Sequence, residues 1–290
     1  YNPLSPYKNM EMAHKIKELY PLHNYKRAGQ ILQRLRSIKT EAELAVMRKA
    51  VEISKKGCER IMKFTKPGAW EYQIEAELVH EFLSNRANGF SFEPIVASGP
   101  SACVLHYIEN NKQVRDGHLI LVDCGVDYAN YASDMTRCLP ANGKFSDRQK
   151  EVYNAVLDVM KQARKKLVPG TMLMEYQKEV EGLMTEELLK LDLLSPQDVK
   201  NQDPAWPAVK KYFMHGTSHH IGLDTHDYGI LTEPMQANMV FTVEPGIYIP
   251  KEGFGVRLED DVVIQEKGEP FNLMKNIPIE VEEIEELMHA

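Results

Sequence analysis

Four carboxylates and one histidine lie at the ends or turns of apolar, strand-like runs. They are Asp123, Asp134, His219, Glu244 and Glu259. Asp123, for example, directly follows the apolar run 119–122. A carboxylate in such surroundings is costly to desolvate unless something compensates its charge. A divalent cation provides that compensation, so the pattern indicates a metal-dependent hydrolase.

The four carboxylates form two similar pairs, each built from an acid, any residue and a glycine, followed by a second acid. Asp134 lies eleven residues after Asp123, and Glu259 lies fifteen residues after Glu244. Adjacent strands would place the members of each pair side by side, because cross-strand neighbours are about 5 Å apart. Two such pairs facing each other can hold two metal ions, with His219 as the single nitrogen ligand. For any single acid, an ordinary solvated strand end is the alternative.

This set of donors also bears on the metal. Oxygen-rich ligation with one imidazole suits a hard or borderline ion better than a thiolate-type zinc site does. The pattern therefore predicts two divalent ions, with Mn²⁺ favoured and Co²⁺, Fe²⁺ or Zn²⁺ as alternatives.

The histidines are concentrated in one segment, with four of the ten between residues 215 and 226. The spacing of His215 and His219 is that of the helical zinc-peptidase motif, but Gly216 stands where that motif has a glutamate. The segment is also rich in poor helix formers, namely Gly216, Thr217, Ser218 and Gly222. We therefore expect strand and loop that curl over a site.

Alternation in the last predicted strand places Arg257, Glu259 and Asp261 on one face. Leu258 and Asp260 then point to the other face. Arg257 can thus reach the same pocket as Glu259 and orient that carboxylate as a hydrogen-bond donor. A surface salt bridge is the alternative reading of this pair.

Composition excludes several other functions. The net charge of −7 argues against a nucleic-acid partner. The sequence has no apolar run long enough to span a membrane and no signal-peptide pattern at its start. It also lacks a G-x-S-x-G nucleophile elbow and a phosphate-binding loop ending in Gly-Lys-Ser or Gly-Lys-Thr. Covalent and nucleotide chemistry are therefore not expected.

The spacing of the four cysteines bears on the cellular compartment of the protein. They show no paired spacing, which indicates reduced thiols and a cytoplasmic protein, and they are Cys58, Cys103, Cys124 and Cys138. Cys124, beside Asp123, is expected to be a small buried residue rather than a reactive one.

Charge divides the 290 residues into two parts. Residues 1–40 hold eight Lys or Arg against two Glu, whereas the remainder carries a net charge of −13. The early part also has three prolines and little periodicity. We expect residues 1–40 to be a basic tail or linker from a preceding domain, docked on this domain or on a partner chain, with a solvated basic arm as the alternative. Residues 41–290 are expected to form the catalytic domain.

The second part reads as a mixture of helices and strands. Capping boxes at Thr40 and Glu43, and at Ser146 and Gln149, predict helices from residue 41 and from residue 147 to before Pro169. Further helices are expected over 71–86 and 173–190. Strand-like runs lie near 92–98, 103–107, 118–138, 239–249 and 255–264. Helices outside a curved, largely antiparallel sheet would make an α+β domain.

Five sequence blocks then resemble, in order, the signatures of the pita-bread metallopeptidases. They are Val-Asp-Cys-Gly at 122–125, Ser-Asp-Met-Thr-Arg at 133–137, His-Gly-Thr-Ser-His at 215–219, Thr-Val-Glu-Pro-Gly at 242–246 and Arg-Leu-Glu-Asp-Asp at 257–261. Within that group the blocks are most similar to Xaa-Pro aminopeptidase, also called aminopeptidase P. The resemblance covers residues 41–290 and implies two pseudo-equivalent halves that form a curved sheet flanked by helices.

The resemblance also implies roles for individual residues. Asp123 would chelate one metal, Asp134 and Glu259 would bridge both, and His219 with Glu244 would complete the other. His106, His215 and His226 would face the substrate, while Tyr248 and Arg257 would lie behind the metals. By the same resemblance, a metal-bridging hydroxide would attack the peptide bond before a second-position proline, with Glu244 shuttling the proton. Peptides with an Xaa-Pro N-terminus would be the substrates, and a homo-oligomer is a further expectation.

Two rival functions stay open. Prolidase shares the site chemistry and cleaves only dipeptides, and Ser218 favours the aminopeptidase reading over it. A pita-bread binding module that has lost catalysis is the rival of another class, although no ligand type is missing from this sequence.

Overall fold

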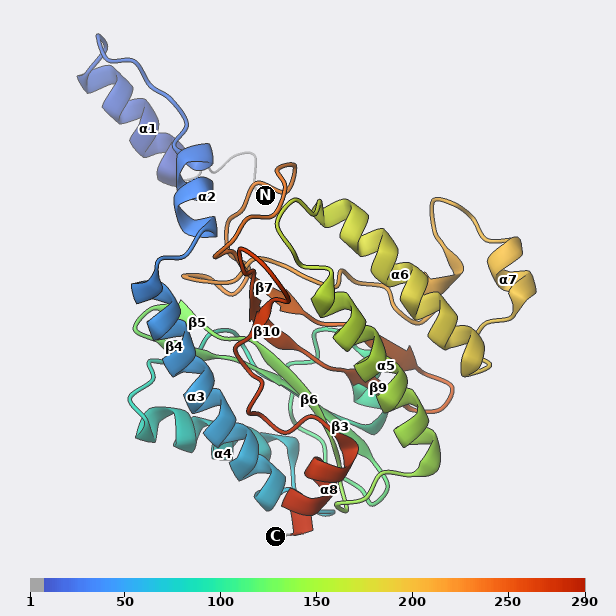
Figure 1. Cartoon of the computed structure of the whole chain (residues 1–290). Coiled ribbons are helices and arrows are strands. Elements are labelled where there is room, and N and C mark those ends of the chain that lie inside the picture. Colours follow the sequence, from blue (N-terminus) through green and yellow to red (C-terminus); the bar gives the residue numbers. More distant parts are fainter. Residues whose placement is uncertain (1–7, 290) are drawn as a thin grey trace.

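The computed structural model describes residues 8–289, which form an α+β fold (Figure 1). Its helices in this range are α1 (Lys8–Leu19), α2 (Gly29–Ser37), α3 (Glu41–Phe64), α4 (Glu71–Ser84), α5 (Asp147–Lys165), α6 (Leu173–Lys190), α7 (Pro196–Lys200) and α8 (Val281–His289), with 3₁₀ turns at Gly99–Cys103 and Ala208–Lys211. Its strands are β1 (Gly89–Phe90), β2 (Ile95–Ser98), β3 (Leu119–Cys124), β4 (Val126–Tyr128), β5 (Tyr131–Ala132), β6 (Met135–Pro140), β7 (Val240–Val243), β8 (Gly246–Ile249), β9 (Phe254–Arg257), β10 (Asp260–Val263) and β11 (Phe271–Asn272).

The two capping boxes start helices as predicted. Thr40 accepts a hydrogen bond from the backbone of Glu43, whose carboxylate accepts one from the backbone of Thr40 at 2.7 Å. Ser146 and Gln149 make the reciprocal pair at the start of α5. Such boxes satisfy amide groups that have no partner inside the helix. The predictions of α3, α4, α5 and α6 are therefore confirmed, with α4 ending two residues early.

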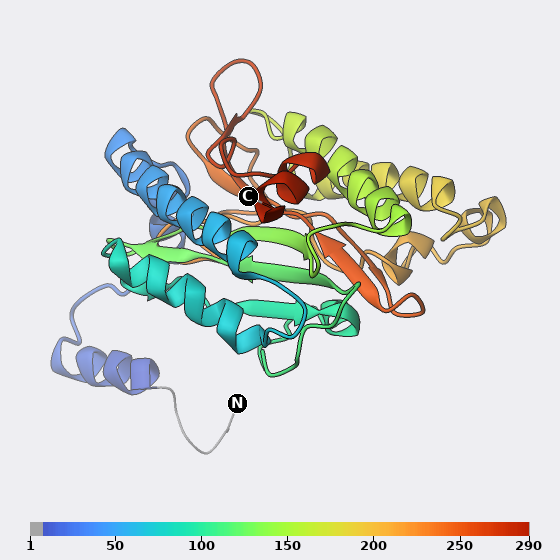
Figure 2. The ribbon, with the colours of Figure 1, turned by 90° about the horizontal axis from the view of Figure 1, so that it is seen from below.

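All strand pairs in the described range are antiparallel. The longest sheet has the order β2-β3-β6, and the others are β11-β10-β7, β1-β4-β5 and β8-β9. Figures 1 and 2 show α3 and α4 at one side of the strands and α5 and α6 at the other. A helix pair followed by strands thus occurs twice along the chain, as the predicted pseudo-equivalent halves require.

A backbone bridge between Thr136 of β6 and Glu259, just before β10, joins the two halves at the acid pairs. The amide of Glu259 donates to the carbonyl of Thr136 at 3.1 Å. Because Asp123 pairs with Thr136 across β3 and β6, this bridge brings the first acid pair beside the second.

One local prediction is wrong, and the N-terminal part has more secondary structure than its sequence pattern indicated. Residues 103–107 are not a strand: the chain forms a 3₁₀ turn at Gly99–Cys103 and then an irregular loop. The N-terminal part within the described range is also more ordered than its weak periodicity indicated, because it contains α1 and α2. Both helices leave apolar side chains exposed, and α1 projects away from the rest of the chain (Figures 1 and 2).

Within residues 8–289, no helix combines the length and the apolar character needed to cross a bilayer. The four cysteines are free thiols, and burial raises the pKa of Cys58, Cys103, Cys124 and Cys138. Cys124 is buried, as expected for a packing residue.

Candidate metal centre

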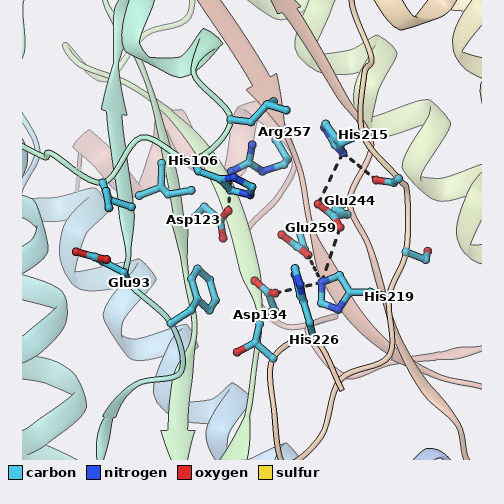
Figure 3. Close-up of a pocket in the computed structure, with 17 residues that line it drawn as sticks. Glu93, His106, Asp123, Asp134, His215, His219, His226, Glu244, Arg257 and Glu259 are labelled. Atoms are coloured by element: carbon cyan, nitrogen blue, oxygen red, sulfur yellow. Dashed lines mark hydrogen bonds and ion pairs between the residues drawn. The ribbon is translucent and has the colours of Figure 1, made fainter. Parts of the chain in front are cut away.

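A pocket of about 560 Å³ lies where the two halves meet (Figure 3). All five predicted metal ligands line it. So do His106, His215, His226 and Arg257. Tyr248 lies behind the pocket, where its hydroxyl contacts two of these residues. The structure therefore gathers at one place all ten residues that the sequence singled out.

The first acid pair is held by long strands. Asp123 is the fifth residue of β3, which pairs with β2 on one side and β6 on the other. Asp134 immediately precedes β6, and its backbone amide donates to Asp261 Oδ2 at 3.1 Å. Both acids are buried, and the pairing of the strands that carry them fixes their positions.

The second acid pair stands at breaks between short strands. Glu244 follows β7, and Glu259 precedes β10. The register of β7 with β10 pairs Val243 with Asp260, which places the two glutamates next to each other. The predicted single strand over 255–264 is thus two strands, β9 and β10, interrupted at Glu259.

The glycine that follows each first acid allows a close approach of neighbouring groups. A Cβ atom on Gly125 would overlap the carbonyl of Ser133, and one on Gly246 would lie 2.8 Å from the hydroxyl of Tyr248. The repeated acid-x-Gly pattern therefore has a steric reason in both halves.

His219 faces the carboxylates with the ring nitrogen that is free to bind an ion. Its Nδ1 lies 3.0 Å from the carbonyl of His220, so this nitrogen carries the proton and donates it. Its Nε2 then presents a lone pair toward Asp134 at 3.5 Å, Glu244 at 3.8 Å and Glu259 at 4.0 Å (Figure 3). A lone pair beside carboxylate oxygens is repulsive unless a cation lies between them.

The donor atoms fit a divalent ion. Ligand atoms of Asp134, His219 and Glu259 all lie within 4.8 Å of one another. Three of the four buried carboxylate oxygens that have no hydrogen-bond partner among the described residues belong to predicted ligands, namely Asp123 Oδ1, Asp134 Oδ1 and Glu259 Oε1. Buried oxygens are normally satisfied, so these three mark the position of a missing positive partner.

The pKa values of the acids reflect the same concentration of negative charge. Burial raises the pKa of Asp134 and of Glu259 well above the usual range, and the neighbouring carboxylates add to the effect. Burial also raises the pKa of Glu244 to about 7, and the positive charge of Arg257 opposes the shift. A bound cation would reverse this trend by favouring the ionised forms.

Behind the carboxylates, Arg257, Tyr248 and His215 form a chain of hydrogen bonds. Arg257 donates to Asp123 Oδ2 at 2.6 Å and to the Tyr248 hydroxyl at 2.9 Å. That hydroxyl lies 2.8 Å from His215 Nε2, and His215 Nδ1 lies 2.8 Å from the carbonyl of Gly216. Burial and the charge of Arg257 lower the pKa of His215 to about 3. His215 is therefore neutral, and both of its ring nitrogens are engaged.

The prediction that Arg257 orients Glu259 directly is wrong. Arg257 lines the same pocket, but the donor to Glu259 is the Thr136 hydroxyl, at 2.8 Å from Oε2. Arg257 Nε contacts that hydroxyl at 3.4 Å. Sequence reasoning missed Thr136, although its place two residues after Asp134 on β6 put it on the same face of the strand.

Two loops form the walls of the pocket. One carries Leu105, His106 and Ile108, and the other carries Thr225 and His226. The His226 ring lies 4.2 Å from that of His219, centroid to centroid. Burial lowers the pKa of His226.

The buried Glu71, at the start of α4, holds the first of these loops. Its carboxylate accepts hydrogen bonds from the Ser98 amide and hydroxyl, from the Tyr107 hydroxyl at 2.8 Å and from the Lys112 amide at 2.9 Å. Both oxygens of Glu71 are thereby satisfied, so the loop is fixed at both of its ends.

The fold and the pocket together define a pita-bread protein with a candidate dinuclear metal centre. The profile of metallopeptidase family M24 matches residues 45–266. The chain therefore belongs to metallopeptidase family M24.

Individual relatives agree with this membership. The chain is 40% identical over 272 residues to the Xaa-Pro aminopeptidase of Escherichia coli, covering 90% of this chain and 61% of that protein. It is 34% identical to human Xaa-Pro aminopeptidase 3, covering 89% of this chain and 52% of that one. The structure of E. coli aminopeptidase P with the inhibitor Pro-Leu superimposes with a TM-score of 0.90 at 36% identity, covering 99% of this chain and 69% of that chain. The chain thus spans about three fifths of its bacterial relative.

Proposed function

We propose that this chain is the catalytic part of a metal-dependent aminopeptidase that releases the first residue from peptides with proline in second position. The observation that carries the proposal is the position of His219 Nε2, which faces three carboxylates with its lone pair. The relatives named as Xaa-Pro aminopeptidases support the choice of substrate.

Five residues would hold two divalent ions, and we propose Mn²⁺ as the preferred metal. Asp134 and Glu259 would contact both ions, Asp123 would complete one site, and His219 with Glu244 would complete the other. The hydrogen bond from His219 Nδ1 to a carbonyl supports this role, because imidazole ligands usually donate their other N–H to such a group. Bound divalent ions supply Lewis acidity and a water-derived nucleophile at neutral pH.

Glu244 is suited to transfer the proton. Its side chain is about 20% exposed, whereas that of Glu259 is only 2% exposed, so Glu244 is the more accessible of the two from the open pocket. It would accept a proton from the attacking water and deliver it to the proline nitrogen as the peptide C–N bond breaks. The Glu244 carboxylate borders the pocket that the substrate would enter, so it can accept a proton there and release it again.

The other side chains would bind and orient the peptide. His226 and His106 face the pocket and would donate hydrogen bonds to the substrate carbonyl as negative charge develops on its oxygen. Arg257 and Tyr248 would fix Asp123 from behind. We propose a catalytic role for His215 that is exerted through Tyr248, because both ring nitrogens of His215 already make hydrogen bonds.

The acidic centre would also select the N-terminus of the peptide. Five carboxylates, including that of Glu93, line the pocket against the single guanidinium of Arg257, so a free ammonium group is attracted to it. The apolar residues that also line the pocket, Phe92, Ile95, Leu105 and Ile108, can accept the adjoining side chains.

Substrate length tests the proposal. The full chain, loaded with Mn²⁺, should cleave Xaa-Pro-Yaa tripeptides faster than Xaa-Pro dipeptides, and Xaa-Ala-Yaa controls slowly or not at all. Faster cleavage of dipeptides would identify a prolidase instead. A protein that binds the metal but cleaves none of these peptides would be a binding module.

Three wider features are also proposed. The start of α3 at Glu41 supports a division into a basic segment, 1–40, and a catalytic domain, 41–290. The four free thiols support a cytoplasmic location. The exposed apolar side chains of α1 and α2 are compatible with a homo-oligomer. Nucleic acid and membranes are not proposed as partners.

A further inference from the structure

The loop that carries His226 has almost no secondary structure of its own. Residues 220–233 contain neither helix nor strand apart from one bridge between His220 and Phe241. Loops of this kind are mobile unless other parts of the chain hold them. The position of His226 against His219 therefore needs an explanation outside the pocket.

Basic residues from the segment before α3 contact this loop. Arg36 pairs with Asp224 at 2.6 Å and with Asp227 at 2.5 Å. Lys39 lies 3.5 Å from the other oxygen of Asp227. We call Arg36, Lys39 and Asp227 the clamp. Asp227 immediately follows His226, so the clamp acts one residue away from the pocket.

The centre of the clamp is buried. The side chains of Lys39 and Asp227 are each 1% exposed, which is unusual for charged groups. Burial lowers the pKa of Lys39, while the charge of Asp227 opposes the shift. A buried ion pair resists separation, because either partner alone would leave an uncompensated charge in the interior.

The backbone around the clamp is fixed as well. The amide of Lys39 donates to the carbonyl of Asn238 at 2.8 Å, and the amide of Asp227 donates to the carbonyl of His220 at 2.8 Å. A Cβ atom on Gly222 would collide with the carboxylate of Asp227, and one on Gly229 would collide with the ring of His220. The loop is thus packed tightly on the side that faces away from the pocket.

We propose that Lys39 and Arg36 are positioning residues, which act through Asp227 to hold His226 at the substrate side of the metal centre. The last residues of the basic segment, 36–39, then support the active centre of the catalytic domain that follows them. The effect on catalysis rests on the function proposed above, whereas the effect on the loop does not.

Two measurements on the full chain test the clamp. Lys39→Met should speed amide hydrogen exchange in residues 220–229 while leaving exchange in β3 and β6 unchanged. With Mn²⁺ saturating, it should lower kcat on an Xaa-Pro tripeptide by roughly 10-fold to 100-fold, as expected for a misplaced catalytic group, with a smaller change in KM. Lys49→Met is the matched control, since Lys49 pairs with Glu52 in an exposed position on α3.

A double-mutant cycle separates positioning from a merely structural role. If Lys39 acts through His226, Lys39→Met should change kcat by no more than about 2-fold in a His226→Ala background. An equal loss of kcat in both backgrounds would overturn the proposal. So would unchanged exchange of the loop in Lys39→Met.

Two further provisions apply if the first variant does not fold or if the wild-type chain is inactive. If Lys39→Met does not fold, Arg36→Gln provides the same readouts, because the Arg36 side chain is 21% exposed and its loss is better tolerated. If the wild-type chain cleaves no Xaa-Pro peptide, the proposed function fails, and the exchange measurement alone decides whether the clamp exists.

Discussion

Two buried arginine–aspartate pairs lie where the halves of the sheet meet, and they are satisfied to different degrees. Arg137 contacts Asp260 at 2.7 Å and also donates to the carbonyls of Thr136, Glu259 and Pro278. The second oxygen of Asp260 accepts from Asn272 at 2.6 Å. The side chains of Arg137 and Asp260 are therefore fully hydrogen-bonded.

The Arg257–Asp123 pair is just as short, at 2.6 Å, but it is incomplete. Asp123 Oδ1 is buried without a hydrogen-bond partner, and it faces the pocket. The comparison shows how a stabilising ion pair differs from one that is prepared for a ligand. In the first pair, protein groups satisfy both oxygens of the aspartate. In the second pair, one aspartate oxygen is left free to bind a cation.

The largest expected effect is a loss of activity without a loss of folding, caused by a substitution in the pocket. Glu244→Gln should lower kcat on an Xaa-Pro tripeptide by roughly 10²- to 10⁴-fold, because the proton shuttle is lost. The folded structure should persist, since Glu244 stands at the open side of the pocket. Steady-state kinetics and circular dichroism of the metal-loaded variant check both statements. Wild-type turnover by this variant would contradict the assignment.

At the fully hydrogen-bonded Arg137–Asp260 pair, a substitution should affect stability more than activity. Arg137→Met should lower the free energy of unfolding by about 3–5 kcal/mol, because it leaves Asp260 buried without its charge partner. Denaturant titration measures this loss. Arg257→Met is the matched variant, and it should weaken Mn²⁺ binding and kcat more than Arg137→Met does. Equal effects of the two substitutions on metal binding would remove the distinction between the pairs.

Binding of Mn²⁺ beside the Arg257–Asp123 pair should stabilise the folded protein. At a free Mn²⁺ concentration of about 100 times Kd, the free energy of unfolding should rise by about 2.7 kcal/mol for one site. A chelator should reverse the gain, and Asp134→Asn should show a smaller one. A thermal or denaturant midpoint that does not respond to Mn²⁺ in the wild type would contradict the metal centre.

The smallest effect concerns pH in the metal-free protein. The pKa of Glu244 is about 7 in the folded chain against an ordinary value of 4.5, so the folded state binds more protons between these values. Its contribution to stability is present at low pH and is lost as the pH rises, by up to about 1.4 kcal/mol per pH unit. Asp134 and Glu259 add in the same direction.

Comparison with Glu244→Gln isolates this contribution from other titrating groups. Between about pH 4.5 and 7, stability should fall more steeply with rising pH in the wild type than in the variant. Urea titrations of both metal-free proteins measure the two slopes. Parallel slopes would show that Glu244 does not carry the shifted pKa.

Local chemistry made much of the fold predictable from sequence. Helix α3 begins at its capping box, and the strands around Asp123 follow from a continuous apolar run. The error at residues 103–107 has a functional reason. Leu105 is apolar because it lines the pocket, and Val104 is 55% exposed, so neither belongs to a sheet. Apolar residues that face a ligand and those that face a sheet look alike in one sequence.

Spacing predicted that the carboxylates gather, and the family resemblance implied that His106, His226 and Tyr248 lie beside them, but neither gave the contacts between these residues. Thr136 as the donor to Glu259 depends on the register between the two halves, which no local pattern encodes. The ion pairs of Lys39 and Arg36 with residues 224–227 link positions far apart in the chain. The basic character of the first segment was visible, whereas its partner became visible only in the folded chain.

The buried carboxylate of Glu71 has a consequence for protein engineering. It ties the wall that carries His106 to the first turn of α4, outside the pocket and away from any ligand. Transplanting only the pocket residues onto a new scaffold would leave that wall unsupported. A successful graft would have to carry α4 and its first residue along with the visible centre.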